Sequence, residues 1–214
     1  MEANGYTIGP NADLCFADLT GADLTGANLT GANLFKANLI DTDLTGANLT
    51  GANLTEANLR WAHLIRATLI DTDLTGAQLT KAKLIKATIT KANLNRATLI
   101  DTDLRGANLT GANLFKANLI DTDLTGANLS GADLSGADLT GADLTEANLN
   151  GADLARATLR WAILRAADLT GANLRWAYLG GANVTRANLT RANLDDAIRL
   201  EDARGLDTVI GLER

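Results

Sequence analysis

Residues 22–34 read ADLTGANLTGANL, and residues 137–149 read ADLTGADLTEANL. In both stretches an apolar residue recurs at every fifth position, and this spacing continues without a break from residue 14 to residue 194. These 37 positions all hold Leu, except for Ile89 and Val184. The residue two places earlier is Ala, except for four threonines, Thr42, Thr72, Thr102 and Thr122. The repeating unit is therefore A-(D/N)-L-x-x, in which Thr and Gly are the commonest last two residues.

A period of five residues fits neither an α-helix nor an ordinary strand. A helix repeats every 3.6 residues, so leucines five apart would be spread around its whole surface. A strand alternates every two residues, but two residues beyond each Leu the chain most often places Gly, Lys or Arg. The pattern predicts a very short strand whose Ala and Leu point inward, followed by a corner where Gly supplies a positive φ. Four such units close a square, and successive squares stack through main-chain hydrogen bonds at about 4.8 Å.

This pattern resembles that of the pentapeptide-repeat family. The resemblance rests on the A-(D/N)-L runs quoted above and covers residues 12 to 197, which is nearly the whole chain. It implies an all-β fold, a right-handed quadrilateral β-helix solenoid with a short C-terminal helical cap. At four units per coil we expect about nine coils and a rod about 40–45 Å long. The expected regions are an N-terminal cap over 1–11, the β-helix over 12–197, and a C-terminal helical cap or dimerisation segment over 198–214.

Both ends of such a stack expose apolar side chains and unpaired strand edges, which favour aggregation unless they are covered. At the N-terminal end we expect Tyr6, Ile8 and Pro10 to fold over the first coil. At the C-terminal end the five-residue register is lost, because Arg199 stands where the next Leu would fall. Both terminal segments are therefore predicted to act as covers.

The residues after the last repeat follow a different pattern. Asp195 or Asp196 is placed to cap a short helix over residues 197–204, and Gly205 is placed to end it. A second apolar cluster follows, formed by Leu206, Val209, Ile210 and Leu212. We expect this segment to cover the last coil, and its resemblance to some family members makes it a candidate for forming a two-fold homodimer.

Composition restricts the classes of partner. The chain has 214 residues, with 19 Lys and Arg against 25 Asp and Glu, and a net charge of −6. Direct binding to nucleic acid or to an anionic membrane is therefore not expected. The single cysteine, Cys15, forms no internal disulfide, and the sequence shows neither a membrane-length apolar run nor a secretory signal. We therefore expect a cytoplasmic location.

No catalytic, cofactor or metal site is predicted, and we do not expect an enzyme. The D-T-D-L runs at residues 41, 71, 101 and 121 begin like a calcium loop, but Ala stands eleven residues on, where a bidentate Glu is needed. His63 and Cys15 have no partner at a spacing suited to metal binding or nucleophilic chemistry. A core filled with Leu also leaves no internal pocket for a substrate.

Two sets of outward residues are candidates for contact with a partner. The first is an acidic ridge, in which carboxylates from neighbouring coils cluster: Asp101, Asp103, Asp121, Asp123 and Asp143. The second is a set of exposed aromatic residues: Phe35, Phe115, Trp61, Trp161, Trp176 and Tyr178. Aromatic side chains often dominate the binding energy of interfaces. The plainer alternatives are that the ridge is merely solvated and that the aromatic rings shield the backbone at the corners.

The function predicted from these features is a non-enzymatic, rigid scaffold for protein–protein interaction, with its protein partner unidentified. The resemblance implies one alternative, because some family members imitate B-form DNA and bind type II topoisomerases such as gyrase. The acidic ridge favours such mimicry, whereas a basic collar interrupts it, formed by Lys81, Lys83, Lys86, Lys91 and Arg96. Another alternative is a consensus-like or designed solenoid with no evolved partner, since residues 26–49 and 106–129 are identical.

Overall fold

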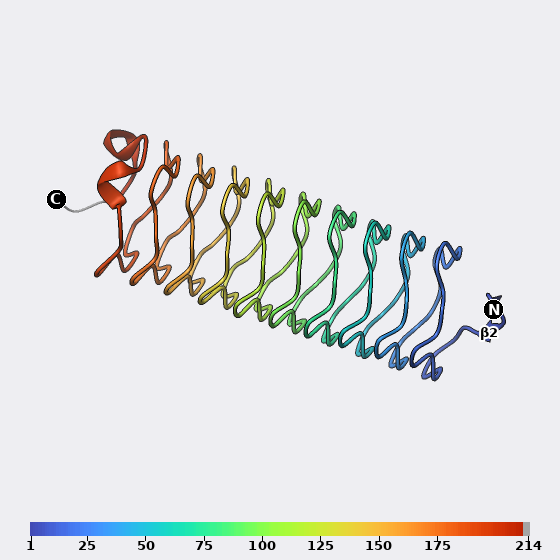
Figure 1. Cartoon of the computed structure of the whole chain (residues 1–214). Coiled ribbons are helices and arrows are strands. Elements are labelled where there is room, and N and C mark those ends of the chain that lie inside the picture. The colour runs from blue at the N-terminus through green and yellow to red at the C-terminus, as the bar shows by residue number, and fades with distance from the viewer. Residues whose placement is uncertain (212–214) are drawn as a thin grey trace.

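The computed structural model describes residues 1–211 and shows them as a single stack of coils (Figure 1). Parallel bridges join the residue between Ala and Leu in each unit to the residue 20 places later, from Asp13↔Asn33 to Tyr178↔Ile198. Four units of five residues therefore make one coil, as the sequence period predicts. Each coil stacks on the next with every side in register, so outward residues 20 apart form columns along the rod.

A continuous column of Leu side chains forms the core. Every repeat position from Leu14 to Leu189 is buried, with Ile89 and Val184 in the same arrangement. The Ala two residues earlier is also buried from Ala17 to Ala187, apart from the four positions that hold Thr. Burial of this large apolar surface is the main driving force that holds the coils together. The interior is filled by side chains, so any binding must use the outer surface.

The four inward threonines replace Ala without leaving an unsatisfied hydroxyl in the core. The Thr102 Oγ1 donates a hydrogen bond of 2.8 Å to the Leu79 carbonyl, one coil earlier. The other three donate in the same way to Leu19, Leu49 and Leu99 over 2.6–2.8 Å. Buried polar groups need such partners, so these threonines add cross-links between coils.

Each corner is a tight turn that places its second residue at positive φ. Gly fills many of these positions, as at Gly131 with φ 62°. The middle Asp or Asn of the unit holds the turn, because its side chain accepts from the backbone N–H two residues later; the Asp133 Oδ1 accepts from the Ser135 N–H at 2.9 Å. Positive φ is unfavourable for bulky L-residues, yet Trp61, Trp161 and Trp176 adopt φ of 56–58°.

The N-terminal residues form a small hairpin beside the first coil, at the blue end of Figure 1. Strand β1 (Glu2–Ala3) pairs antiparallel with β2 (Tyr6–Thr7). The Asn4 Nδ2 donates to the Asp18 and Thr20 carbonyls, each at 3.3 Å, and these belong to the free edge of the first coil. Ile8 is buried at the head of the Leu column, and Tyr6 packs against it.

The C-terminal segment continues the stack for one irregular turn, at the red end of Figure 1. It contains two short 3-10 helices, η1 (Leu200–Asp202) and η2 (Leu206–Thr208). Between and beyond them the bridges Asn183↔Arg204 and Asn188↔Ile210 extend the ladder, at spacings of 21 and 22 residues. Leu206 and Val209 pack against the core. Leu212, which the sequence places in the same apolar cluster, lies outside the described residues.

The helix expected over residues 197–204 is wrong in both length and start. The residue before η1 is Arg199, in a left-handed conformation, and no side chain caps the helix, so neither Asp195 nor Asp196 has the predicted role. The reason is that Ile198 and Arg204 pair with the coil beneath them through main-chain hydrogen bonds of 2.8 Å. A longer helix would have to give up these ladder bonds.

Candidate interaction surfaces

The columns created by the 20-residue coil bring the predicted acidic ridge together. On one side of the rod the bridges run through one column: Asp23, Asp43, His63, Lys83, Asp103, Asp123, Asp143 and Ile163. The adjoining corner carries another set: Asp41, Trp61, Lys81, Asp101, Asp121 and Trp161. The ridge therefore occupies the middle of the rod, while Trp61 and Trp161 lie on the same corner on either side of it.

Arg105 neutralises part of the acidic ridge. Its Nε donates to the Asp103 Oδ1 at 2.9 Å, its second guanidinium nitrogen lies 2.6 Å from the Asp103 Oδ2, and its Nε lies 3.5 Å from the Asp123 Oδ2. Burial raises the pKa of Asp103, but the hydrogen bonds and charge of Arg105, helped by Lys83, outweigh this effect and hold that pKa below its usual value. The repulsion between the carboxylates of Asp103 and Asp123 is therefore reduced by a cation of the same chain.

Arg105 is not among the residues predicted from the sequence as part of the ridge. The signal is that the run at residue 101 reads D-T-D-L-R, whereas the other three D-T-D-L runs continue with Thr. Asp101 and Asp121 are exposed and Asp143 is half-buried, and within residues 1–211 none of these three carboxylates forms an ion pair. The ridge is therefore a mixed surface with three unpaired carboxylates.

The basic collar encircles one coil. Lys81, Lys86, Lys91 and Arg96 occupy its four successive corners with φ of 56–61°. Lys83 lies on one side of the same coil and is bridged to His63 and Asp103 in the neighbouring coils. The collar separates the acidic ridge from the acidic N-terminal part of the rod, as the sequence suggests.

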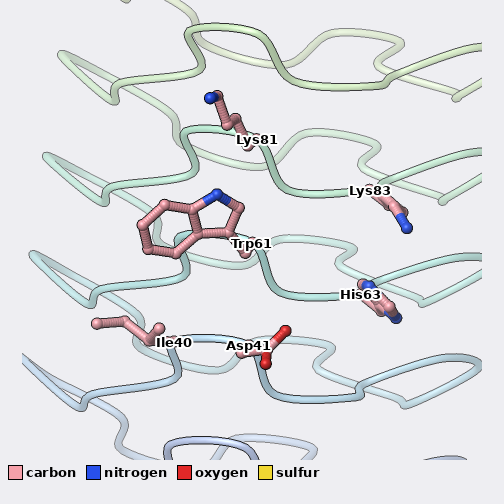
Figure 2. A pocket seen from close by; sticks show the side chains of 6 residues that line it. All are labelled: Ile40, Asp41, Trp61, His63, Lys81 and Lys83. Atoms are coloured by element: carbon pink, nitrogen blue, oxygen red, sulfur yellow. The ribbon is translucent and has the colours of Figure 1, made fainter.

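An open groove lies where the collar meets Trp61 (Figure 2). Its volume is about 420 Å³ and its lining residues are Ile40, Asp41, Trp61, His63, Lys81 and Lys83. In Figure 2 the indole of Trp61 lies between the coils that carry Ile40 and Lys81, and His63 and Lys83 project along the neighbouring column. The Arg60 guanidinium lies 5.2 Å from the Trp61 ring. This groove offers one aromatic surface and a basic edge.

A larger aromatic surface lies near the C-terminal end of the rod. We call it the arginine–tryptophan face and define it by six residues: Arg156, Arg160, Trp161, Arg175, Trp176 and Tyr178. Trp161 is 56% exposed and Trp176 is 39% exposed. The bridge Thr158↔Tyr178 places Tyr178 on the side of the rod that these two corners bound. The two tryptophans predicted from the sequence are therefore brought together with Tyr178.

Three arginines lie against the two exposed tryptophans. The Arg160 guanidinium is 3.8 Å from the centre of the Trp161 ring. Arg156 and Arg175 lie 5.0 and 4.3 Å from the Trp176 ring. These distances are within the range of favourable cation–π contact. The arginines are not among the predicted interaction residues, although the repeated string L-R-W-A at 59–62, 159–162 and 174–177 is the signal for two of them.

Two adjacent glycines give the rings of this face room to lie close to the backbone. A Cβ at Gly181 would lie 2.5 Å from the Trp161 Cδ1, and a Cβ at Gly180 would lie 2.6 Å from the Tyr178 Cε1. Gly181 has φ 72° and would suit a corner in any case. Gly180 does not have a positive φ, so its lack of a side chain is explained by the Tyr178 ring and not by its backbone.

The phenylalanines are less accessible than the sequence predicts. Phe35 and Phe115 are half-buried, and the Nζ of the following residue, Lys36 or Lys116, lies 5.0 Å from each ring. Phe35 also meets Phe16 edge to face, with ring centres 5.6 Å apart. Phe16 is 65% exposed, although it is not among the predicted interaction residues. Phe35 thus belongs to an aromatic pair near the first coil, and Phe115 stands alone.

Two negative findings concern residues 1–211. None of the described helices is long and apolar enough to cross a bilayer. The described side chains contain no group of three or more His, Cys, Asp or Glu arranged to hold a metal ion.

Comparison with known proteins gives the family. A model of pentapeptide repeats matches the chain in eight copies that together span most of residues 12–198. The solved structure of HetL, a pentapeptide repeat protein involved in heterocyst differentiation regulation from the cyanobacterium Nostoc sp. strain PCC 7120, is 36% identical. That likeness covers 90% of this chain and 86% of HetL, with a TM-score of 0.60.

Weaker likenesses extend across other solved structures. A trypsin-treated form of QnrB1, a plasmid-mediated fluoroquinolone resistance protein, is 20% identical over 85% of this chain and 83% of its own, with a TM-score of 0.47. A pentapeptide repeat protein from the thylakoid lumen of Arabidopsis thaliana is 29% identical over 64% of this chain and 86% of its own, with a TM-score of 0.25. No curated protein matches the chain in sequence. On the family model and the likeness to HetL, the chain belongs to the pentapeptide-repeat family, and its coils wind as a right-handed β-helix.

Proposed function

We propose that this protein is a rigid, non-enzymatic scaffold that binds another protein through its arginine–tryptophan face. The observation that carries the proposal is the exposure of Trp161 and Trp176 beside three arginines on one side of the rod. Trp, Tyr and Arg are the residues that most often dominate the binding energy of protein interfaces. A filled core leaves only the outer surface for binding, and a stack of bridged coils holds that surface rigid.

Folding alone does not account for these tryptophans. Each occupies a corner with positive φ, where Gly is relaxed and a bulky residue is strained by roughly 1–3 kcal/mol. Neither ring contributes to the buried Leu column. A large side chain that stays partly exposed at an unfavourable backbone position is what a binding site can be expected to contain. The structure therefore favours contact over shielding of the corners as the reason for Trp161 and Trp176.

We propose the division of the chain as 1–11, 12–197 and 198–214, with about nine coils in the central region. Bridges that run in one column from Asp13 to Asn193 support this coil count. The packing of Leu206 and Val209 against the core supports a covering role for the last region. A homodimer formed through that region and a cytoplasmic location both stay predictions.

Imitation of DNA to modulate a type II topoisomerase is the second candidate function. The exposed Asp101 and Asp121 and the half-buried Asp143 support it. Arg105 between Asp103 and Asp123 counts against it, and so does the basic collar. Positive charge therefore interrupts the row of carboxylates at two places along the rod, at Arg105 and at the basic collar.

The scaffold function is tested by affinity capture from a native lysate of the source organism. The intact chain should retain at least one specific protein, and the double variant Trp161→Gly, Trp176→Gly should lose it. The variant Trp61→Gly, which removes the same kind of side chain from the same corner five coils earlier, should still capture it. A ridge variant with Asp101 and Asp121 changed to Asn should capture it as well.

Three results would contradict the proposal. Equal capture by the double Trp variant would show that the arginine–tryptophan face is not the binding surface. Loss of capture in the ridge variant alone, together with inhibition of gyrase supercoiling by the intact chain, would favour DNA mimicry. Failure to capture any protein would favour a consensus-like or designed solenoid with no evolved partner.

A further inference from the structure

The geometry points to an acidic, extended segment of a partner protein as the occupant of the arginine–tryptophan face. This inference rests on the proposed scaffold function and adds the chemistry of the partner. It is carried by the three arginines that contact the tryptophan rings, by the shape that Gly180 and Gly181 give the surface, and by the carboxylates that border it.

The three guanidinium groups are oriented by aromatic rings and are left nearly free of ionic partners. Among the described residues their one ion pair joins Arg175 to Asp196 at 3.9 Å, between side chains that are 41% and 63% exposed. A guanidinium that contacts an aromatic ring still has N–H groups that can donate to a carboxylate. Arg156, Arg160 and Arg175 therefore offer guanidinium N–H groups to the carboxylates of a partner.

The shape of the face suits a chain that lies flat across it. Trp161 and Trp176 stand at the two corners that bound one side of the rod, and Tyr178 lies on the side between them. Gly180 and Gly181 remove the side chains that would otherwise push the rings outward. An extended segment alternates its side chains between two faces. Its acidic residues can reach the arginines at the corners while the backbone lies over Tyr178.

The surroundings favour a short acidic protein segment over a nucleic acid. The bridge Asp138↔Thr158 places a carboxylate one coil before the face, in the same column as Tyr178. Asp196 lies beyond Arg175 at the opposite edge. A phosphate backbone that followed the rod would meet one of these carboxylates within a single coil, and binding to nucleic acid depends on many phosphate contacts. A protein segment can place its few carboxylates within the face and end there.

The groove at Trp61 supplies a matched control within the same molecule. It has the same L-R-W-A string, and Arg60 lies 5.2 Å from the Trp61 ring. It lacks a second Trp and a Tyr, and Thr80 and Lys81 stand where Gly180 and Gly181 stand in the face. If stacked arginine alone were sufficient, Trp61 would matter as much as Trp161.

The test is fluorescence anisotropy on the full chain at low salt with three labelled probes. The first is a dodecapeptide of alternating Glu and Thr, the second is the same peptide with Gln in place of Glu, and the third is an oligothymidylate of equal charge. We expect the acidic peptide to bind and the other two to bind at least about tenfold more weakly. Added salt should weaken the complex, because the contact is between charged groups.

Variants then assign the binding to the face. The double variant Trp161→Gly, Trp176→Gly and the double variant Arg156→Gln, Arg160→Gln should each weaken binding of the acidic peptide about tenfold or more. Trp61→Gly should change it by less than about twofold. Circular dichroism and thermal unfolding serve as the check on folding. The Trp→Gly variants should keep the fold, since Gly is the residue that the repeat most often places at these corners.

The outcomes separate this inference from the scaffold function. Equal binding of the neutral peptide, tighter binding of the oligothymidylate, unchanged binding by the double variants or no binding of the acidic peptide at millimolar concentration would each overturn the acidic segment. If capture from lysate still depends on Trp161 and Trp176, the scaffold function stands and only the partner's chemistry is wrong. If capture also fails, both are wrong.

Discussion

A single residue, Arg105, changes the local charge of the acidic ridge. Its guanidinium contacts Asp103 and Asp123, and hydrogen bonding and charge hold the pKa of Asp103 below its usual value in spite of burial. A carboxyl whose pKa is lower in the folded chain stabilises the fold above its unfolded pKa of about 3.9. That contribution is lost as the pH falls through the lowered folded value.

We therefore expect the melting temperature to depend on Asp103 in a pH-dependent way. At pH 7 the variant Asp103→Asn should melt about 1–3 °C below the parent chain, because a partly exposed ion pair contributes modestly. As the pH falls through the lowered folded pKa of Asp103, the two melting temperatures should converge. Asp101→Asn is the control, since it removes a ridge carboxylate that has no ion pair in the described chain. A constant difference across the pH range would show that the ion pair is not the cause.

At the scale of the element, the C-terminal segment shows how the ladder overrides local preference. The sequence around 197–204 predicts a helix, but Ile198 and Arg204 pair with the coil beneath them, and only the three-residue η1 remains. Leu206 and Val209 then pack against the end of the Leu column. The segment is therefore held both by main-chain bonds and by apolar contacts.

Removal of residues 198–214 should leave a folded stack that associates end to end. The deletion exposes Leu189 and Leu194 together with the free main-chain edge of the last coil, and such edges pair readily with other chains. Light scattering at increasing protein concentration measures the effect. The variant Leu206→Asn, which keeps the main-chain ladder, should associate much less than the truncated chain. A truncated chain that stays monodisperse would contradict the covering role.

At the scale of the whole molecule, the same Ala and Leu face inward on all four sides, so the core does not distinguish one side from another. Deletion of residues 131–135 should therefore preserve the fold and turn everything after it by one side of the square. Thermal unfolding should shift by only a few degrees, because one unit in 37 is lost. Binding of the acidic peptide should be unchanged, because the arginine–tryptophan face lies wholly beyond the deletion.

A second deletion provides the matched contrast. Removal of residues 166–170 takes out a unit of the same length, but it lies between Trp161 and Trp176. It moves them from neighbouring corners to opposite corners of the rod, so that they no longer bound the same side. Peptide binding should then be lost while the melting temperature stays close to that of the first deletion. Equal peptide binding by the two deletion variants would show that the face is not one site.

The sequence predicts the features of this molecule that repeat with the period and does not predict those that depend on single side chains. The A-x-L period gives the coil, its side and its inward residues, and counting by 20 places Asp103 beside Asp123 and Trp61 on the corner of Trp161. The contact of Arg105 with both carboxylates and the stacking of Arg160 on Trp161 depend on side-chain rotamers, which no period specifies. The end of the stack is not predicted either, because Arg204 pairs with Asn183 at a spacing of 21 residues, which differs from the 20-residue period.

From Asp13 to Ile198 the bridges have a constant spacing of 20 residues, so each residue number gives two coordinates on the surface of the rod. The remainder after division by 20 gives the bearing around the rod, and the quotient gives the altitude, at about 4.8 Å per step. The outer surface is then a two-dimensional grid on which each pentapeptide occupies one cell. Exchanging pentapeptides between cells changes the surface that a partner contacts, while the inward residues and the coil stay the same. Two chains of this kind can therefore share nearly every inward residue and have no partner in common.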